Sequence, residues 1–221
     1  MSQLPPAVRE SEFLAIDTVD EDEILRKFGP FVRKLHSFLN QLHCLHDIQQ
    51  TRQKWRTQVQ YKEAFGTFAT EPRHWYTFNN GGRNEAQYNI GLFPTYLRVG
   101  LGFEFTQKKG GDPNIVGLAY ACFKNVIDQD SEGFRQFVHE NLLEVEWELS
   151  VGNPKLVPTE QVVQWLRQPP QASWVFVGRL LRRGKDTMIL EDPLQLKHTI
   201  ESVFNGFRPI WEQTQIMAKK E

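Results

Sequence analysis

Cysteine is scarce in this 221-residue chain, and long hydrophobic runs are absent. Cys44 and Cys122 are the two cysteines, isolated and far apart, so a disulfide framework is excluded and a reducing compartment is expected. No stretch approaches the roughly 18 apolar residues of a membrane span, and the N-terminus lacks the apolar segment of a secretory signal. We therefore expect a cytoplasmic protein with no membrane partner.

Net charge is also close to absent, at −1, so the total charge does not indicate a nucleic-acid binder. Its distribution along the chain is uneven. Residues 1–24 hold seven acidic residues against one basic residue, residues 30–109 hold eleven basic against five acidic, and residues 110–172 hold nine acidic against four basic. Such segregation can steer an anion toward one face, or can reflect no more than differently solvated surfaces.

Recognisable catalytic and metal-binding motifs are missing. The chain has neither GxSxG nor GxxxxGK[ST], and the glutamates of the 144–148 segment lack the lysine of a metal-dependent nuclease. His36, His43, His46 and His74 lack the glutamate of an HExxH motif. We name no catalytic residue, expect no metal and no cofactor, and rank an enzyme with an unrecognised motif last.

Hydrophobic spacing predicts the organisation of the chain. Residues 1–19 are expected to form an acidic flexible arm, and residues 20–221 a single α+β domain. Apolar residues at three- and four-residue spacing predict a long helix over 24–55, interrupted at Gly29–Pro30. The sheet and shorter helices are expected over 60–190. A C-terminal helix is expected over 193–217, capped by Asp192 and bent or broken at Gly206 and Pro209.

Alternating aromatic and β-branched runs predict a mixed or mostly antiparallel sheet of about five strands. The expected strands cover residues 74–79, 87–93, 96–105, 144–149 and 173–181. Gly100 and Gly102 lie within one of them and predict a bulge or close packing. The glutamates of 144–149 predict an acidic outer face. Helices are expected over 115–127, 134–143 and 159–167, the second with Asp130 or Ser131 as its cap.

The most distinctive stretch covers residues 64–78, where five aromatic residues alternate with, or lie near, basic residues. Nucleic-acid sites combine planar side chains, which stack on bases, with cations, which hold phosphates. On this hypothesis the base contacts are Phe68, Trp75 and Tyr76, and the phosphate contacts are Arg73, Arg83, Arg98, Lys108 and Lys109. The alternative is that some of these aromatics belong to the core.

The same stretch resembles the N-terminal DNA-binding domain of the McrB-type modification-dependent restriction proteins. The matching segments are Phe65-Gly66-Thr67-Phe68 with Pro72 and Trp75, then Tyr88–Phe93, then Tyr96–Gly102. The likeness covers residues 60–105, and it departs from the family in separating Pro72 from Trp75 by two residues. It implies an aromatic pocket for a flipped, modified base within an antiviral defence system, with a nuclease or an ATPase/GTPase subunit as partner.

The sequence supports two hypotheses about function, one a nucleic-acid-binding module and the other a protein-interaction subunit. The first is a non-enzymatic DNA-binding module of a restriction system. The second is a protein-interaction or assembly subunit whose helix 24–55 docks a partner, or forms a homo-oligomer, through its apolar seam. A steep salt dependence of DNA binding separates the two, because only the first neutralises phosphates.

Overall fold

The structure is a computed structural model that describes eight segments of the chain. They are residues 4–16, 21–45, 56–61, 74–80, 86–105, 117–149, 154–168 and 172–218. The backbone divides into two compact units. Unit 1 contains residues 1–80, 89–99 and 180–202, and unit 2 contains residues 81–88, 100–179 and 203–221. The expectation of one domain over residues 20–221 stays a prediction.

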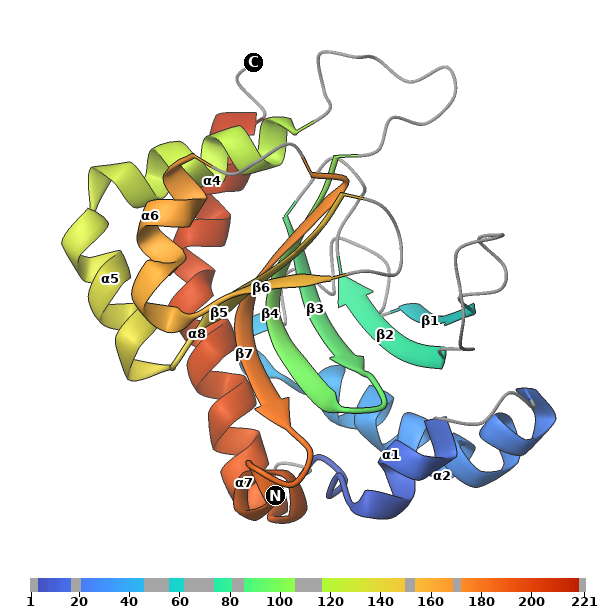
Figure 1. Cartoon of the computed structure of the whole chain (residues 1–221). Helices are drawn as coiled ribbons and strands as arrows, with labels where there is room; N and C mark the ends of the chain where they lie inside the picture. Colours follow the sequence, from blue (N-terminus) through green and yellow to red (C-terminus); the bar gives the residue numbers. More distant parts are fainter. Residues whose placement is uncertain are drawn as a thin grey trace. The chain divides into compact units, whose positions relative to one another are not determined.

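The strands form one sheet in the order β1-β2-β3-β4-β7-β5-β6 (Figure 1). Their bounds are β1 Arg56–Tyr61, β2 His74–Asn80, β3 Gln87–Leu92, β4 Tyr96–Glu104, β5 Glu144–Glu148, β6 Lys155–Val157 and β7 Trp174–Arg182. The pairs β1–β2, β5–β6 and β5–β7 are antiparallel. The α+β class is confirmed and all five expected strands are present. With β1 and the three-residue β6, the sheet has seven strands within the described segments.

Along the chain, the described helices come before, between and after groups of strands, as in an α+β fold. Their bounds are α1 Glu10–Ile16, α2 Glu21–Leu39, α4 Leu118–Gln129, α5 Ser131–Glu140, α6 Val162–Arg167, α7 Thr187–Glu191 and α8 Pro193–Ala218, with short 3₁₀ turns η1 His43–Leu45 and η4 Thr159–Gln161. Of the helices in the described segments, none combines the length and the apolar character needed to cross a bilayer.

The N-terminal segment is packed, which corrects the expectation of a flexible arm over 1–19. Phe13 and Ile16 of α1 are buried at 2% and 0% exposure. The Val8 amide donates to the Leu190 carbonyl at 2.7 Å, and the Glu10 carboxylate pairs with the Arg183 guanidinium. Residues 4–16 are therefore held by core contacts that their acidic composition concealed. Residues 1–3 and 17–19 lie outside the described part.

The long helix expected over 24–55 is wrong in its extent, because α2 ends at Leu39. The Gln41 and Leu42 amides donate to the carbonyls of Phe38 and Leu39, three residues earlier, and so tighten the chain into a turn. Leu42 and Leu45 are nonetheless buried, at 2% and 0% exposure. The apolar spacing thus predicted correctly that Leu42 and Leu45 are buried, although the helix ends before them. Residues 46–55 lie outside the described part, and β1 begins at Arg56.

The apolar seam of α2 is covered within the single chain. Its members are Phe28, Phe31, Leu35, Phe38 and Leu39, all between 0% and 6% exposed. One layer of this cover comes from α1, which packs against α2 in unit 1. These five described residues are therefore not open to a partner, which argues against docking through them, while the assembly-subunit hypothesis and the homo-oligomer through helix 24–55 stay predictions.

Glycines in β4 allow close packing in unit 2, as one of the two sequence alternatives predicted. A Cβ on Gly102 would collide with the indole of Trp174, and a Cβ on Gly100 would collide with the Val177 carbonyl of β7. The chain can place an aromatic ring and a neighbouring backbone against β4 only because both positions lack a side chain.

The core of unit 2 is built largely from aromatic rings. Phe103 of β4 packs on Phe123 of α4 with ring centroids 4.8 Å apart, and Phe123 meets Phe134 of α5 edge-on at 6.0 Å. Phe137 of α5 packs edge-on against Phe207 of α8 at 5.0 Å. These pairs join α4, α5 and α8, and Figure 1 shows these helices together with α6 beside β5 and β7. Such contacts add to the burial of apolar area.

Helix α8 runs from Pro193 to Ala218 without the break considered at Gly206 and Pro209. Asp192 caps it as expected: its Oδ1 accepts the Leu194 amide at 2.8 Å and the Gln195 amide at 3.3 Å. Asp130 caps α5 in the same way, accepting the Gly133 amide at 3.0 Å. Both caps satisfy amide groups that the first helical turn leaves unpaired.

The acidic outer face expected for residues 144–149 is wrong at its centre. Glu146 is 1% exposed, whereas Leu149, assigned to the inner side, is 57% exposed. The register places Glu146 between Phe176 of β7 and Leu156 of β6. Val145 on the opposite face is also buried, at 0% exposure, so both faces of the sheet are covered at this point of β5, which the alternation within one strand does not reveal.

Candidate nucleic-acid interface

The aromatic residues proposed to bind DNA lie partly in β2, which pairs with β1 in unit 1. The register joins Trp75 to Gln60, Thr77 to Gln58 and Asn79 to Arg56. On the alternate positions it joins Tyr76 to Val59 and Phe78 to Thr57. Because successive strand residues belong to opposite faces, the two sets define two different faces of the strand pair.

One face therefore carries Trp75 with polar and basic residues, and the other carries Thr57, Val59, Tyr61, His74, Tyr76 and Phe78. The polar face holds Arg56, Gln58, Gln60, Trp75, Thr77 and Asn79. Neither strand contains an acidic residue. A tryptophan among amides and an arginine provides both a ring that can stack on a base and groups that can hydrogen-bond to base edges or phosphates.

The register also separates two of the residues that the sequence placed at one base contact. Tyr76 belongs to the face of Val59 and Phe78, opposite to Trp75. Phe68, Arg73, Arg83, Lys108 and Lys109 lie outside the described segments. Of the eight candidate DNA contacts, the structure thus places Trp75 and Tyr76 by backbone position and Arg98 in full.

Arg98 does not project as a surface phosphate contact, because it is only 5% exposed. Its Nε donates to Asn89 Oδ1 across the β3–β4 pair at 2.9 Å, and its guanidinium lies 4.7 Å from the centre of the Phe93 ring. That ring stacks in turn on Tyr96, with centroids 4.7 Å apart. The alternation with Gly100 and Gly102 had suggested a solvated side chain. Asn89, 1% exposed, was not singled out by the sequence, and its polar type within a buried run was the one available signal.

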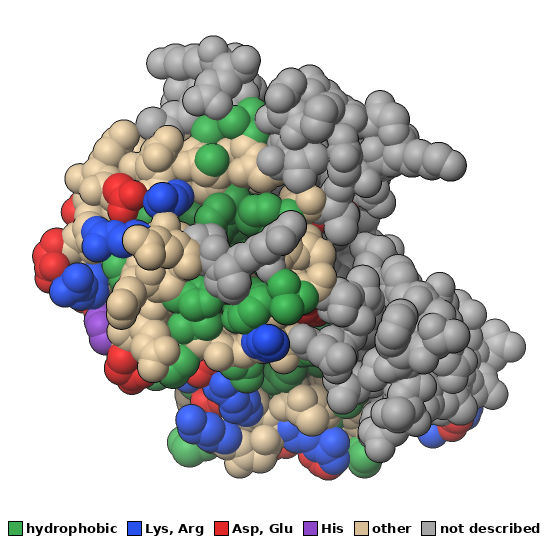
Figure 2. All heavy atoms as spheres, turned by 45° about the horizontal axis from the view of Figure 1, so that its top comes forward, with side chains coloured by type: hydrophobic (Ala, Val, Ile, Leu, Met, Phe, Trp, Pro, Cys, Tyr) green, Lys and Arg blue, Asp and Glu red, His purple; other side chains and the backbone are tan. Residues whose placement is uncertain are grey.

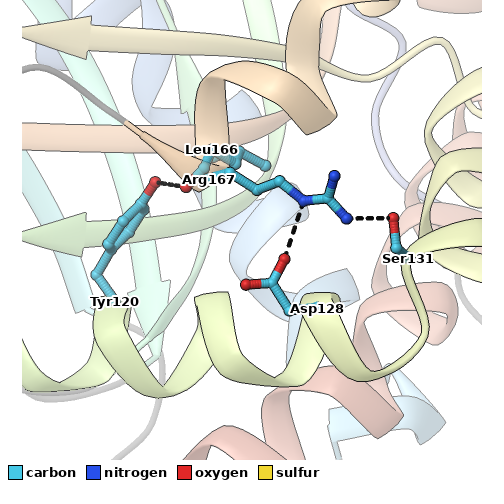
Figure 3. Close-up of polar contacts among 5 residues, drawn as sticks. All are labelled: Tyr120, Asp128, Ser131, Leu166 and Arg167. Carbon is cyan, nitrogen blue, oxygen red and sulfur yellow. Dashed lines mark hydrogen bonds and ion pairs between the residues drawn. The ribbon is translucent and has the colours of Figure 1, made fainter.

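A second polar cluster lies in unit 2, where α4, α5 and α6 meet (Figure 3). The Tyr120 hydroxyl donates to the Leu166 carbonyl at 2.7 Å, and burial raises the pKa of this phenol. Arg167 Nε donates to Asp128 at 2.9 Å, while its Nη2 donates to Ser131 Oγ at 2.7 Å. The phenol stays protonated and engaged, so the cluster joins three helices and offers no free acid or base.

No group of three or more His, Cys, Asp or Glu residues in the described segments is arranged to hold a metal ion. His36 lies 3.3 Å from the Asn40 side chain on α2, and His43 lies beyond the end of that helix, in η1. His46 lies outside the described segments, as does the side chain of His74. The helical histidine face that the sequence suggested is therefore divided by the turn after Leu39.

Charge on the face of the molecule shown in Figure 2 is mixed. Most of its described lysine, arginine, aspartate and glutamate side chains lie interspersed at the left and lower edges, with no extended patch of one sign, and hydrophobic side chains gather in the middle. Comparison with models of known protein families finds no match, and neither does comparison with curated proteins. The likeness to the McrB-type domain stays a prediction.

Proposed function

We propose that the chain is a DNA-binding module that contacts duplex DNA through the polar face of the β1–β2 strand pair. The observation that supports this proposal is the register, which gathers Trp75 with Gln58, Gln60 and Arg56 on a face without acidic residues. Trp75 stacks on a base, the amides reach base edges, and Arg56 with Arg73 and Arg83 holds phosphates.

The proposed set of DNA-contacting residues is smaller than the set predicted from the sequence. Tyr76 belongs to the opposite face, and Arg98 is buried against Asn89, so neither is assigned to DNA. Phe68, Lys108 and Lys109 remain candidates by composition. A role in a restriction or defence system, beside a nuclease or NTPase subunit, rests on the resemblance to the McrB-type domain.

Binding is tested by titrating the full chain against labelled duplexes, with modified and unmodified cytosine, at two salt concentrations. Trp75→Ala is expected to weaken binding by about 1–3 kcal/mol, or roughly 5- to 160-fold, while the melting temperature stays unchanged. Trp147→Ala is the matched control, because Trp147 is a half-exposed strand tryptophan of unit 2 that packs on Trp165. It should leave DNA affinity unchanged.

Three results would contradict the proposal in different ways. No binding by the wild type at low salt refutes DNA binding altogether. A loss of roughly 3–5 kcal/mol in folding stability on Trp75→Ala identifies Trp75 as a core residue. The third result is DNA binding that is unchanged in Trp75→Ala and lost in Arg73→Ala/Arg83→Ala. It would support DNA binding through phosphates and refute the base contact by Trp75.

A further inference from the structure

Helix α2 exposes four cations outside its apolar seam, two opposite the seam and two on its flank. They are Arg26, Lys27, Arg33 and Lys34, which we call the basic stripe. Arg26 and Lys27 keep 73% and 50% of their side-chain surface exposed. The two pairs are seven residues apart, so they repeat after two turns on nearly the same side of the helix, about 10.5 Å along its axis.

The two pairs differ in how far protein carboxylates neutralise them. Glu23 lies 4.0 Å from Arg26 and 2.5 Å from Lys27. Arg33 and Lys34 form no ion pair with any residue that the structure describes. The Arg33 Nη1 atom lies 3.4 Å from the position of a Cβ on Gly29, so this guanidinium extends back along the helix over a residue without a side chain.

A helix with one basic and one apolar face can also bind an anionic membrane, by inserting its apolar residues. That route is closed for α2, because Phe28, Phe31 and Leu35 are 0%, 6% and 3% exposed within the chain. The basic stripe can therefore bind a ligand only through its positive charge. A ligand with regularly repeated anions matches two cation pairs at a fixed spacing.

We infer that the basic stripe binds the phosphate backbone of duplex DNA, as a second contact beside the β1–β2 face. This inference rests on the proposed function for the identity of the polyanion. Within unit 1, α1 packs against α2 and also contacts β2. Helix α1 thus contacts both the helix that carries the stripe and one strand of the β1–β2 pair, and the stripe is tested as a phosphate contact in its own right.

The test measures duplex affinity of the full chain between about 50 and 200 mM salt, where counterion release governs phosphate contacts. Losing both contacts in Arg33→Ala/Lys34→Ala should lower the slope of log affinity against log salt by about 1.8. Over that range the wild type should then lose about 12-fold more affinity than the variant. Arg135→Ala/Lys185→Ala, which removes two other exposed cations, is the matched control and should keep the wild-type slope.

The outcomes separate this inference from the proposed function. An unchanged slope in Arg33→Ala/Lys34→Ala overturns the basic stripe, and a loss of affinity in Trp75→Ala then still supports the β1–β2 face. A reduced slope with no effect of Trp75→Ala supports the stripe and refutes the base contact. If the wild type does not bind duplex DNA, or binds only anionic vesicles, both the basic stripe and the proposed function are refuted. Equal melting temperatures of the variants confirm that folding is not the cause.

Discussion

Gly206 lies inside α8, where replacement by alanine normally stabilises a helix by about 1 kcal/mol. Here a Cβ would lie 2.6 Å from Cζ and 2.7 Å from Cδ2 of Phe137, and closer still to Cε2. The Phe137 ring has little room to move away, because it packs edge-on against Phe207 and is tilted against Phe134. Overpacking of this kind costs about 1–3 kcal/mol. Gly206→Ala should therefore reduce the free energy of unfolding by about 0–2 kcal/mol.

The sign should reverse when the ring is removed. In a Phe137→Ala background, Gly206→Ala should raise stability by about 1 kcal/mol, because only the helix propensity remains. The coupling energy of the double-mutant cycle then equals the overpacking term, about 1–3 kcal/mol. Urea denaturation of the four proteins, followed by circular dichroism, measures it. An equal stabilisation by Gly206→Ala in both backgrounds would show that the α5–α8 contact does not depend on the missing side chain.

Three further predictions test other elements. Leu35→Asp should cost more than about 2 kcal/mol, because the side chain is 3% exposed and an unpaired charge would be buried; an unchanged melting temperature would place this face in solvent. Asp130→Ala should cost about 1 kcal/mol through loss of the Gly133 amide contact, measured by denaturation, with Asp130→Asn retaining most of the stability. Backbone hydrogen bonds from Leu194 and Gln195 lower the pKa of Asp192 below its usual 3.8, so the stability that Asp192 contributes is present above that pH and lost as the pH falls through the lower folded-state value. Asn retains the cap and removes only the charge, so thermal melts of wild type and Asp192→Asn should differ slightly near neutral pH and converge in acid. A difference that persists below the folded-state pKa would show that the charge of the Asp192 carboxylate is not its cause.

The candidate site was only partly accessible to sequence analysis. Composition located the aromatic and basic stretch, and strand alternation alone places Trp75 on the face opposite Tyr76 and Phe78. Only the pairing with β1 shows that Arg56, Gln58 and Gln60 share the face of Trp75. It also assigned Arg98 to phosphate, since alternation within β4 says which residues share a face and not what covers that face. The buried partner Asn89 comes from the neighbouring strand, nine residues earlier.

Local signals in the sequence determined the elements whose causes are local. The caps Asp130 and Asp192 and the five alternating strands could be recognised because hydrogen bonds to the first helical turn and strand periodicity involve residues close together in the chain. Tertiary structure alone decided where α2 stopped, because Leu42 and Leu45 continue the apolar spacing while the backbone turns to bury them. It also decided that Glu146 is buried and that the segment 4–16, with its helix over Glu10–Ile16, packs on the core. Apolar periodicity in the sequence predicts which side chains are buried. The path of the backbone that buries them depends on contacts between segments far apart in the chain.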